Sequence, residues 1–178
     1  MRVFVLFLFV TQAIFSQQYF TRTGTTEFKA SVDTFEPVEA KNNSTTVVLD
    51  TNDGAIASLL LVKGFRFRVA LMQEHFNENY MDSNEYPKAT FKGKIHDFNV
   101  TELSSTKEYK ISGTLTIKGK SKLISTKATL QKSGNMIILK SSFSVTPQDF
   151  NIKIPSIVRK KIAERIHISI HYELSQKK

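Results

Sequence analysis

Apolar and polar residues alternate one by one along much of this sequence, and this alternation is the feature that most constrains its fold. The clearest case is residues 165–174, where Ile or another large apolar residue occupies every second position from Ile166 to Leu174. Successive side chains of a β-strand point to opposite faces of the sheet, so such a segment has one buried face and one wetted face. The pattern predicts a chain built from half-buried strands.

Segments of this kind recur along the chain and are separated by turn-forming residues. The predicted strands cover residues 27–32, 45–49, 55–62, 89–95, 113–131 with a break near 119, 136–145 and 165–174. They do not alternate with helices as the strands of parallel sheets do, which predicts an all-β, antiparallel architecture. Closing such a sheet into a barrel removes the long exposed edges that these strands would otherwise present.

Turn chemistry and breaks in the alternation predict how the strands are joined. Residues 50–54 (DTNDG) predict a tight hairpin, because Asp-Gly supplies the positive φ that such turns require. Residues 132–135 (KSGN) predict a second turn, and residues 41–44 (KNNS) are expected to form a loop. Near residues 96–97 the apolar side chains change from odd to even positions, which predicts a β-bulge.

One segment departs from the two-residue period. Met72, Phe76 and Tyr80 are spaced four residues apart, and Val69 lies about one helical turn before them. This spacing places the four side chains on one face of a helix. A short amphipathic helix that ends before Pro87 is therefore predicted between two strands.

The first residues predict an export signal. Arg2 precedes an unbroken apolar run over residues 3–10, and the small residue Ser16 marks a plausible cleavage point. The run is too short to cross a membrane, and its alternative interpretation is a buried N-terminal strand. We expect residues 1–16 to be a signal peptide and residues 17–178 to be one domain, soluble in the periplasm or secreted after cleavage near Ser16.

Charge and cysteine content limit the partners and the chemistry. The formal net charge of +9 falls to +8 without Arg2, and the densest basic group is Arg159–Lys161 with Arg165. Because the lysines are spread along the strands, we interpret the charge as a solvated surface. Transient contact with an anionic membrane surface is the alternative, and nucleic acid is not an expected partner. The absence of cysteine excludes thiol nucleophiles and thiolate metal sites.

Catalytic and metal-binding patterns are scarce. His167 and His171 lie on one face of a predicted strand but about 13 Å apart, too far to share one metal. The sequence contains no G-x-S-x-G elbow, no H-E-x-x-H pair and no phosphate-binding glycine loop. We therefore predict that the protein is not an enzyme and has no catalytic residue, metal site or cofactor.

Three blocks of sequence carry a resemblance to a known family. They are residues 72–80 with 86–93 (MQEHFNENY and YPKATFKG), residues 113–119 (GTLTIKG) and residues 143–152 (FSVTPQDFNI). In order and spacing they resemble the YceI family, lipocalin-like polyisoprenoid-binding proteins of the bacterial periplasm, over residues 22–174. Two positions differ from the family pattern. Asn151 replaces a glycine and can keep a left-handed turn, whereas Pro147 stands where a basic residue is common, so a ligand contact by that charge is in doubt.

The resemblance implies an eight-stranded antiparallel barrel around a long tunnel. Its ligand would be a long apolar lipid, such as a polyisoprenoid, an isoprenoid quinone or a fatty-acid-like chain, and its function that of an exported carrier or buffer. Residues 55–62, apolar on both faces, would form a wall with the lipid on one side and the helix on the other. The alternative is a non-catalytic structural or stress-related interaction protein with a filled barrel, and a homodimer remains open.

The alternation and the helical face together name candidate ligand-binding residues. Five of them lie on the apolar sides of predicted strands and are expected to face the tunnel. Two lie on the predicted helix and are expected to cap one end, where methionine can adapt to ligands of different length. The strand residues are Phe91, Leu115, Ile117, Phe143 and Val145, and the helix residues are Met72 and Phe76.

Overall fold

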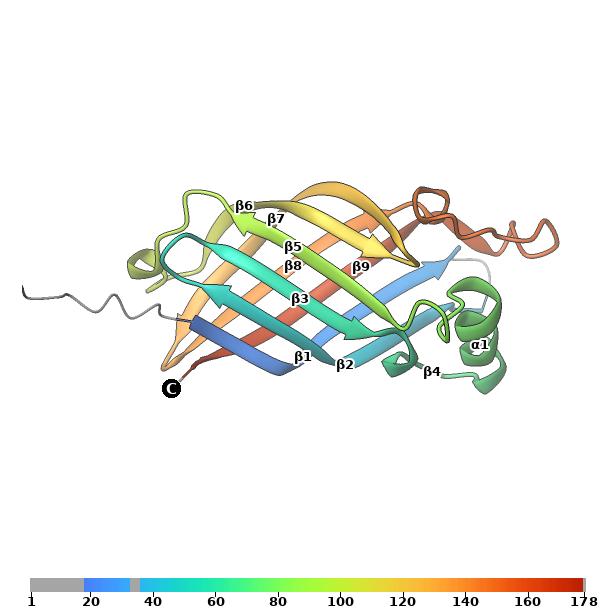
Figure 1. Cartoon of the computed structure of the whole chain (residues 1–178), viewed down its shortest axis with the longest axis horizontal. Coiled ribbons are helices and arrows are strands. Elements are labelled where there is room, and N and C mark those ends of the chain that lie inside the picture. The colour runs from blue at the N-terminus through green and yellow to red at the C-terminus, as the bar shows by residue number, and fades with distance from the viewer. Residues whose placement is uncertain (1–17, 33–35, 178) are drawn as a thin grey trace, which may run out of the picture.

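Eight long antiparallel strands close into a barrel, with one short helix at one end (Figure 1). The computed structural model describes residues 18–32 and 36–177, so the predicted signal peptide, residues 1–16, lies outside the described residues. Each long strand pairs with the next one in the chain, and the first pairs with the last to close the sheet. The predicted all-β, eight-stranded barrel is confirmed.

The elements follow one another as an up-and-down meander. The strands are β1 (Gln18–Ser31), β2 (Glu39–Asp50), β3 (Ala55–Leu61), β4 (Arg66–Phe67), β5 (Lys88–Ile95), β6 (Lys107–Ile117), β7 (Lys120–Ser133), β8 (Met136–Val145) and β9 (Ile162–Gln176). The helical elements are α1 (Ala70–His75) and the short turns η1 (Val62–Gly64), η2 (Phe76–Tyr80), η3 (Val100–Glu102) and η4 (Pro147–Phe150). The two-residue β4 pairs with the start of β2.

An up-and-down barrel places its connections alternately at two ends. The connections after β2, β5 and β7 lie at what we call the core end, and those after β1, β3, β6 and β8 lie at the helix end, which carries α1 (Figure 1). Fully buried side chains fill the barrel at the core end, among them Leu49, Leu130, Leu139 and Leu174. This cluster is the main hydrophobic core of the described chain.

The predicted bulge near residues 96–97 is wrong, because the chain leaves the sheet there. Strand β5 ends at Ile95, and a turn with a positive φ of 53° at Asp97 redirects the backbone. Phe98 and Val100 then pack against the core cluster from the β5–β6 connection. The change from odd to even apolar positions therefore marks a segment that folds over the core end.

The loop predicted at residues 41–44 is also wrong, since these residues belong to β2. The register between β1 and β2 shifts on both sides of Gly24, first by one extra residue of β1 and then by one extra residue of β2, so the original register returns at the pair Thr26 and Asn42. Asn42 is fully buried at this place. Its Nδ2 donates to the carbonyl oxygen of Leu61 at 2.9 Å, and its Oδ1 accepts from the backbone N–H of Ser44 at 2.8 Å. These bonds satisfy a polar side chain that sequence patterning assigns to a loop.

The predicted helix is confirmed as α1 followed by the π turn η2. It lies across the helix end beside β4 rather than on the outer face of β3 (Figure 1), where Leu61 is 51% exposed. The expectation that the helix covers that side of residues 55–62 is therefore wrong. Within the described ranges, no helix is both long enough and apolar enough to span a membrane.

Three predicted backbone features are confirmed at the turns. Gly54 has a φ of 76° in the hairpin between β2 and β3, and residues 134–135 join β7 to β8. Asn151 has a φ of 55° and holds the left-handed turn after η4. Asparagine adopts this conformation at lower cost than other non-glycine residues, so the turn survives without glycine.

Candidate ligand-binding cavity

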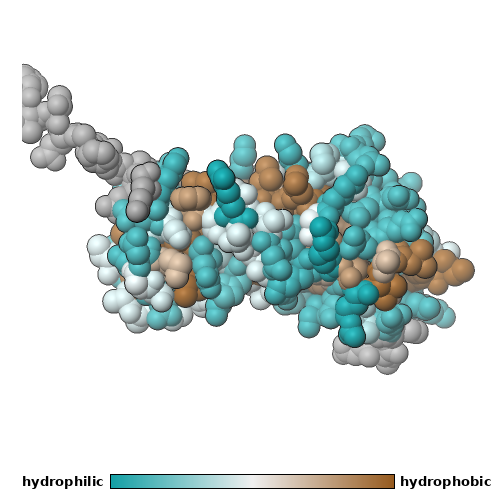
Figure 2. All heavy atoms as spheres, turned by 90° about the horizontal axis from the view of Figure 1, so that it is seen from below, coloured by the Kyte–Doolittle hydropathy of each residue, from teal (hydrophilic) through white to brown (hydrophobic). Residues whose placement is uncertain are grey.

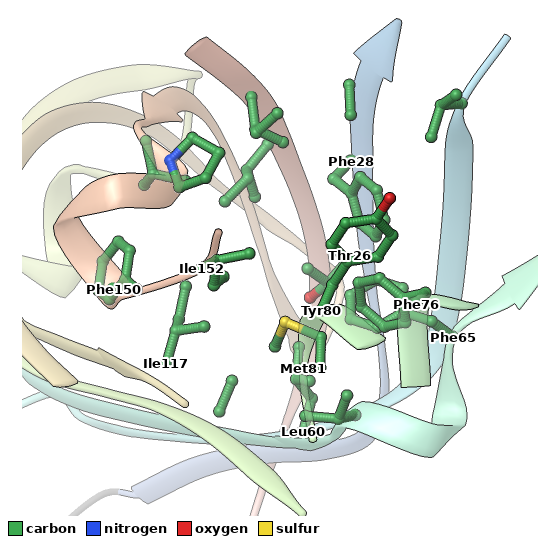
Figure 3. A pocket seen from close by; sticks show the side chains of 18 of the residues that line it. Thr26, Phe28, Leu60, Phe65, Phe76, Tyr80, Met81, Ile117, Phe150 and Ile152 are labelled. Carbon is green, nitrogen blue, oxygen red and sulfur yellow. The ribbon is translucent and has the colours of Figure 1, made fainter. Parts of the chain in front are cut away.

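A blind cavity of about 540 Å³ occupies the half of the barrel nearest the helix end. Its lining includes residues from seven of the eight long strands, from α1 and η2, and from the β8–β9 connection. Figure 3 shows Ile117, Phe150 and Ile152 across the cavity from Met81 and Tyr80. Most of these side chains are apolar, so the cavity suits an apolar ligand.

The core cluster closes the cavity on the side towards the core end, and we call this surface the floor of the cavity. Ile56, Ile111 and Tyr172 belong both to the core cluster and to the cavity lining. Between these residues and the core end the barrel is packed with fully buried side chains, so the cavity ends part-way along the barrel axis. The interior is thus neither the long tunnel implied by the family resemblance nor a completely filled barrel.

All seven residues proposed from the sequence as ligand-binding residues line this cavity. Phe91 of β5 and Leu115 of β6 are direct cross-strand partners, and Ile117 lies two residues further along β6. Phe143 and Val145 line it from β8, and the helix residues Met72 and Phe76 line it from the helix end. Their shared position agrees with the expected geometry, while their contact with a ligand stays a prediction.

A glycine pair explains how Phe91 reaches over the neighbouring strand. Gly93 and Gly113 face each other across β5 and β6. A Cβ atom on Gly113 would lie 2.4 Å from the Cα of Gly93 and 2.8 Å from Cζ of the Phe91 ring. The ring therefore occupies the space that side chains would take at this pair, and glycine is required here for the close approach.

Other lining residues were not named from the sequence. Four residues of β9, at every second position, line the cavity. The alternation of residues 165–174 places them on one face of a strand, so they could have been named from the sequence. Three apolar residues of the β8–β9 connection after η4 also line it, but they belong to no strand whose partner could define their face. These residues are Ile166, Ile168, Ile170 and Tyr172 of β9, and Ile152, Ile154 and Val158 of the connection.

Two sets of contacts hold the helical segment over the cavity. Phe76 packs against Phe28 of β1, Phe65 and Phe67, with ring centroids 5.1–5.6 Å apart. On the other side, Lys118 Nζ donates to the carbonyl oxygen of Tyr80 at 2.9 Å and pairs with Asp82 Oδ2 at 2.6 Å. The helical segment is thereby tied both to β1 and to the β6–β7 turn.

A small polar group interrupts the apolar floor. The Tyr172 hydroxyl lies 3.3 Å from Thr26 Oγ1, which lies 2.8 Å from Thr45 Oγ1. Burial raises the pKa of Tyr172 above its ordinary value of 10.0, although hydrogen bonds with Thr26 and Ser58 act in the opposite direction. Thr26, Ser58 and Tyr172 all line the cavity, so its floor offers neutral hydrogen-bonding groups.

The raised pKa of Tyr172 predicts a loss of stability at alkaline pH. The unfolded chain releases this proton near pH 10, whereas the folded chain retains it to higher pH. The contribution is therefore complete below pH 10 and is lost as the pH rises towards the folded-state pKa. Urea unfolding between pH 9 and pH 11 should show a steeper decline for the native chain than for Tyr172→Phe. Equal declines would contradict this assignment.

His75 is part of the cavity lining, whereas His96, His167 and His171 are not. His167 and His171 are exposed on β9, and His96 Nε2 lies 2.6 Å from Ser112 Oγ. Among the residues that the structure describes, no group of three or more His, Asp or Glu side chains could hold a metal ion.

A family model for the YceI-like domain matches residues 10–174. The chain belongs to the YceI family. A search of curated proteins found no match. The family assignment predicted from three sequence blocks is thus confirmed, and it covers nearly the whole chain.

Solved structures of YceI-like proteins share the fold at low sequence identity. A polyisoprenoid binding domain from Saccharophagus degradans, implicated in plant cell wall breakdown, is 13% identical, with a TM-score of 0.77 over 91% of this chain and 99% of that one. Burkholderia cenocepacia BcnA is 19% identical, with a TM-score of 0.69 over 85% and 96%. The Campylobacter jejuni YceI protein is 18% identical, with a TM-score of 0.64 over 81% and 87%.

One departure from the pattern expected from the family resemblance lies at the rim of the cavity. Pro147, where that resemblance led us to expect a basic residue, is buried and lines the cavity. Phe150, three residues later, is fully buried and also lines it. This part of the wall is therefore apolar, and no charge from residue 147 can contact a ligand.

Proposed function

We propose that this protein binds one long apolar lipid in the cavity and serves as an exported, non-catalytic carrier or buffer. The observation that carries the proposal is the blind, largely apolar cavity of about 540 Å³ above a solid core. A largely apolar cavity of this size is in the range of small-molecule sites, roughly 300–1,000 Å³. The alternative of a filled barrel is disfavoured by the same cavity.

The energetics favour a single lipid chain. Each buried methylene contributes about 0.8 kcal/mol, so some 20 methylenes would contribute roughly 16 kcal/mol. This gain exceeds or offsets the cost of association, estimated at about 4–15 kcal/mol. Because the gain depends on chain length more than on functional groups, we expect weak selectivity among polyisoprenoids, isoprenoid quinones and fatty-acid-like chains.

The floor restricts what part of a lipid can reach it. An ionised headgroup beside Tyr172 would lose its hydration without a countercharge, because the floor residues Thr26, Ser58 and Tyr172 are neutral. A hydroxyl, a carbonyl or an amide could exchange hydrogen bonds with them. A ligand that fills the cavity to its floor should therefore end there in a neutral group or a hydrocarbon terminus.

Two further observations support the carrier role. The Saccharophagus degradans neighbour is described as a polyisoprenoid binding domain, and it shares this fold. The charged and apolar pattern of residues 1–16 supports export, with residues 17–178 as the mature lipid-binding domain. We place the mature protein in the periplasm or outside the cell.

Native mass spectrometry of freshly purified protein tests the proposal directly. The expected spectrum contains one chain with one bound lipid, and the lipid mass after release identifies its class. Protein secreted by its host should begin near Gln17. A spectrum of ligand-free chain only, together with no uptake of added fatty acid or quinone, would overturn the lipid-binding proposal.

A further inference from the structure

The β8–β9 connection presents two different faces. Ile152, Ile154 and Val158 line the cavity, whereas Ile157 is 87% exposed to solvent. An isolated exposed isoleucine is ordinary on a protein surface. Here it is on the same ten-residue segment, residues 152–161, whose other apolar side chains form the wall of the cavity.

The same segment is strongly basic. Lys153, Arg159, Lys160 and Lys161 are exposed, and no acidic residue occurs between Asp149 and Glu164. Apolar and basic residues therefore occur together over the rim of the cavity. An exposed apolar side chain flanked by cations is the composition that binds an anionic membrane interface.

A second segment with this composition lies beside the first. Leu123 of β7 is 79% exposed, and the exposed Lys120 and Lys122 precede it. The side chain of Lys122 pairs with Asp149 of η4, which joins this part of β7 to the start of the β8–β9 connection. We call residues 120–123 and 152–161 together the basic rim.

Exposed apolar residues concentrate at the helix end. Of the seven large hydrophobic side chains that are exposed in the described chain, five lie in or next to the connections at that end. Figure 2 shows hydrophobic atoms projecting beside hydrophilic ones at the right-hand end of the molecule, the end that carries α1 in Figure 1. The five are Val32, Leu61, Leu71, Leu123 and Ile157, and the other two are Val48 and Met136.

The charges of the connections differ between the two ends. At the core end they contain three acidic residues, Asp53, Asp97 and Glu102, and neither lysine nor arginine. At the helix end, the segment that carries α1 has mixed charge and the β1–β2 connection contributes the exposed Glu36, so the β8–β9 connection is the strongly basic segment at that end. An anionic surface would therefore attract the helix end and turn the cavity towards itself.

We propose that the basic rim docks on anionic phospholipid bilayers, with Ile157 and Leu123 entering the interface and the cations contacting headgroups. The proposal rests on the proposed function for its purpose, since a docked cavity lets a lipid chain pass between bilayer and barrel with little exposure to water. The membrane contact itself depends on the charges and apolar side chains of the basic rim and not on whether the cavity binds lipid. Because a few cations and two apolar side chains anchor weakly, the contact is reversible.

Flotation of the full mature chain with lipid vesicles tests the docking surface. We expect binding to vesicles of phosphatidylcholine with 30% phosphatidylglycerol, and at least about tenfold weaker binding to phosphatidylcholine alone. Each cation near an anionic surface strengthens binding about fivefold, so two such cations already exceed this difference. The triple change Lys153→Gln, Arg159→Gln and Lys160→Gln should weaken binding to the anionic vesicles at least about tenfold. Ile157→Ser should weaken it several-fold.

Matched control variants carry the same changes away from the basic rim. Lys110→Gln, Lys132→Gln and Lys140→Gln remove three exposed charges from β6, β7 and β8, and Met136→Ser removes an exposed apolar side chain at the core end. These variants should bind anionic vesicles within about twofold of the native chain. Equal losses in the rim and control variants would overturn a local docking surface.

Two further outcomes separate this proposal from the lipid-binding function. No binding to anionic vesicles, while mass spectrometry still shows bound lipid, would overturn the docking surface and leave the function standing. Vesicle binding by the basic rim in a chain that takes up no lipid would overturn the lipid-binding function and leave the docking surface standing. Self-association that Ile157→Ser abolishes, without vesicle binding, would assign the rim to a second copy of this chain and overturn the membrane proposal.

Discussion

Replacing Leu115 or Phe143 by tryptophan is expected to remove most of the lipid that purifies with the protein. Both side chains line the cavity, Leu115 from β6 and Phe143 from β8. A tryptophan that displaces about two methylenes of ligand would remove about 1.6 kcal/mol, or roughly tenfold in affinity. Overpacking should cost only about 1–3 kcal/mol of folding free energy. Native mass spectrometry of each variant measures the bound fraction.

The control for these variants is Ser142→Trp. Ser142 is exposed on the outer face of β8, next in sequence to Phe143, so a tryptophan there adds the same bulk outside the barrel. We expect it to keep a full complement of lipid. Loss of lipid in the Ser142 variant with retention in the other two would reverse our inside and outside. Retention in all three would exclude the cavity as the binding site.

The largest loss of stability is expected in the core end. Leu139→Ala should lower the free energy of unfolding by about 3–5 kcal/mol, because Leu139 is fully buried in the core cluster and its truncation opens a new cavity. Ile168→Ala, in the wall of the existing cavity, should cost only about 1–2 kcal/mol in the lipid-free protein. Urea unfolding of delipidated variants measures both values.

Lipid content should respond to these two changes in the opposite order. Leu139→Ala leaves the cavity wall intact and should retain the bound lipid at temperatures where the chain is folded. Ile168→Ala removes part of the wall against which a ligand packs and should weaken binding. Similar costs of unfolding for the two variants would mean that the space around Ile168 is filled in solution, which would favour the filled-barrel alternative.

Strands and turns could be predicted because their signals are local. The alternation of residues 165–174 identifies the inner face of β9 without knowledge of its neighbours, since side chains alternate by the geometry of a strand. Asp53-Gly54 and Gly134-Asn135 identify two hairpins because turn conformations depend on the residues within them. The helical spacing of Met72, Phe76 and Tyr80 likewise identified the segment that covers the cavity.

Segments whose structure depends on distant partners could not be predicted in this way. Residues 41–44 are polar and read as a loop, yet they pair with β1, and Asn42 is buried because the distant Leu61 carbonyl accepts its hydrogen bond. The apolar residues after Ile95 suggested a continuing strand, but Phe98 packs over the core end instead. Both outcomes depend on contacts between parts of the chain that sequence periodicity does not relate.

Sequence alone determined that this chain forms a closed antiparallel barrel with an apolar interior, because alternation and turn chemistry act residue by residue. It could not decide where that interior is filled. Leu139 and Phe143 lie on the same face of β8, yet the first is packed into the core and the second lines the cavity. What separates them is the set of side chains that the other strands place opposite each one, and only the tertiary structure supplies those neighbours.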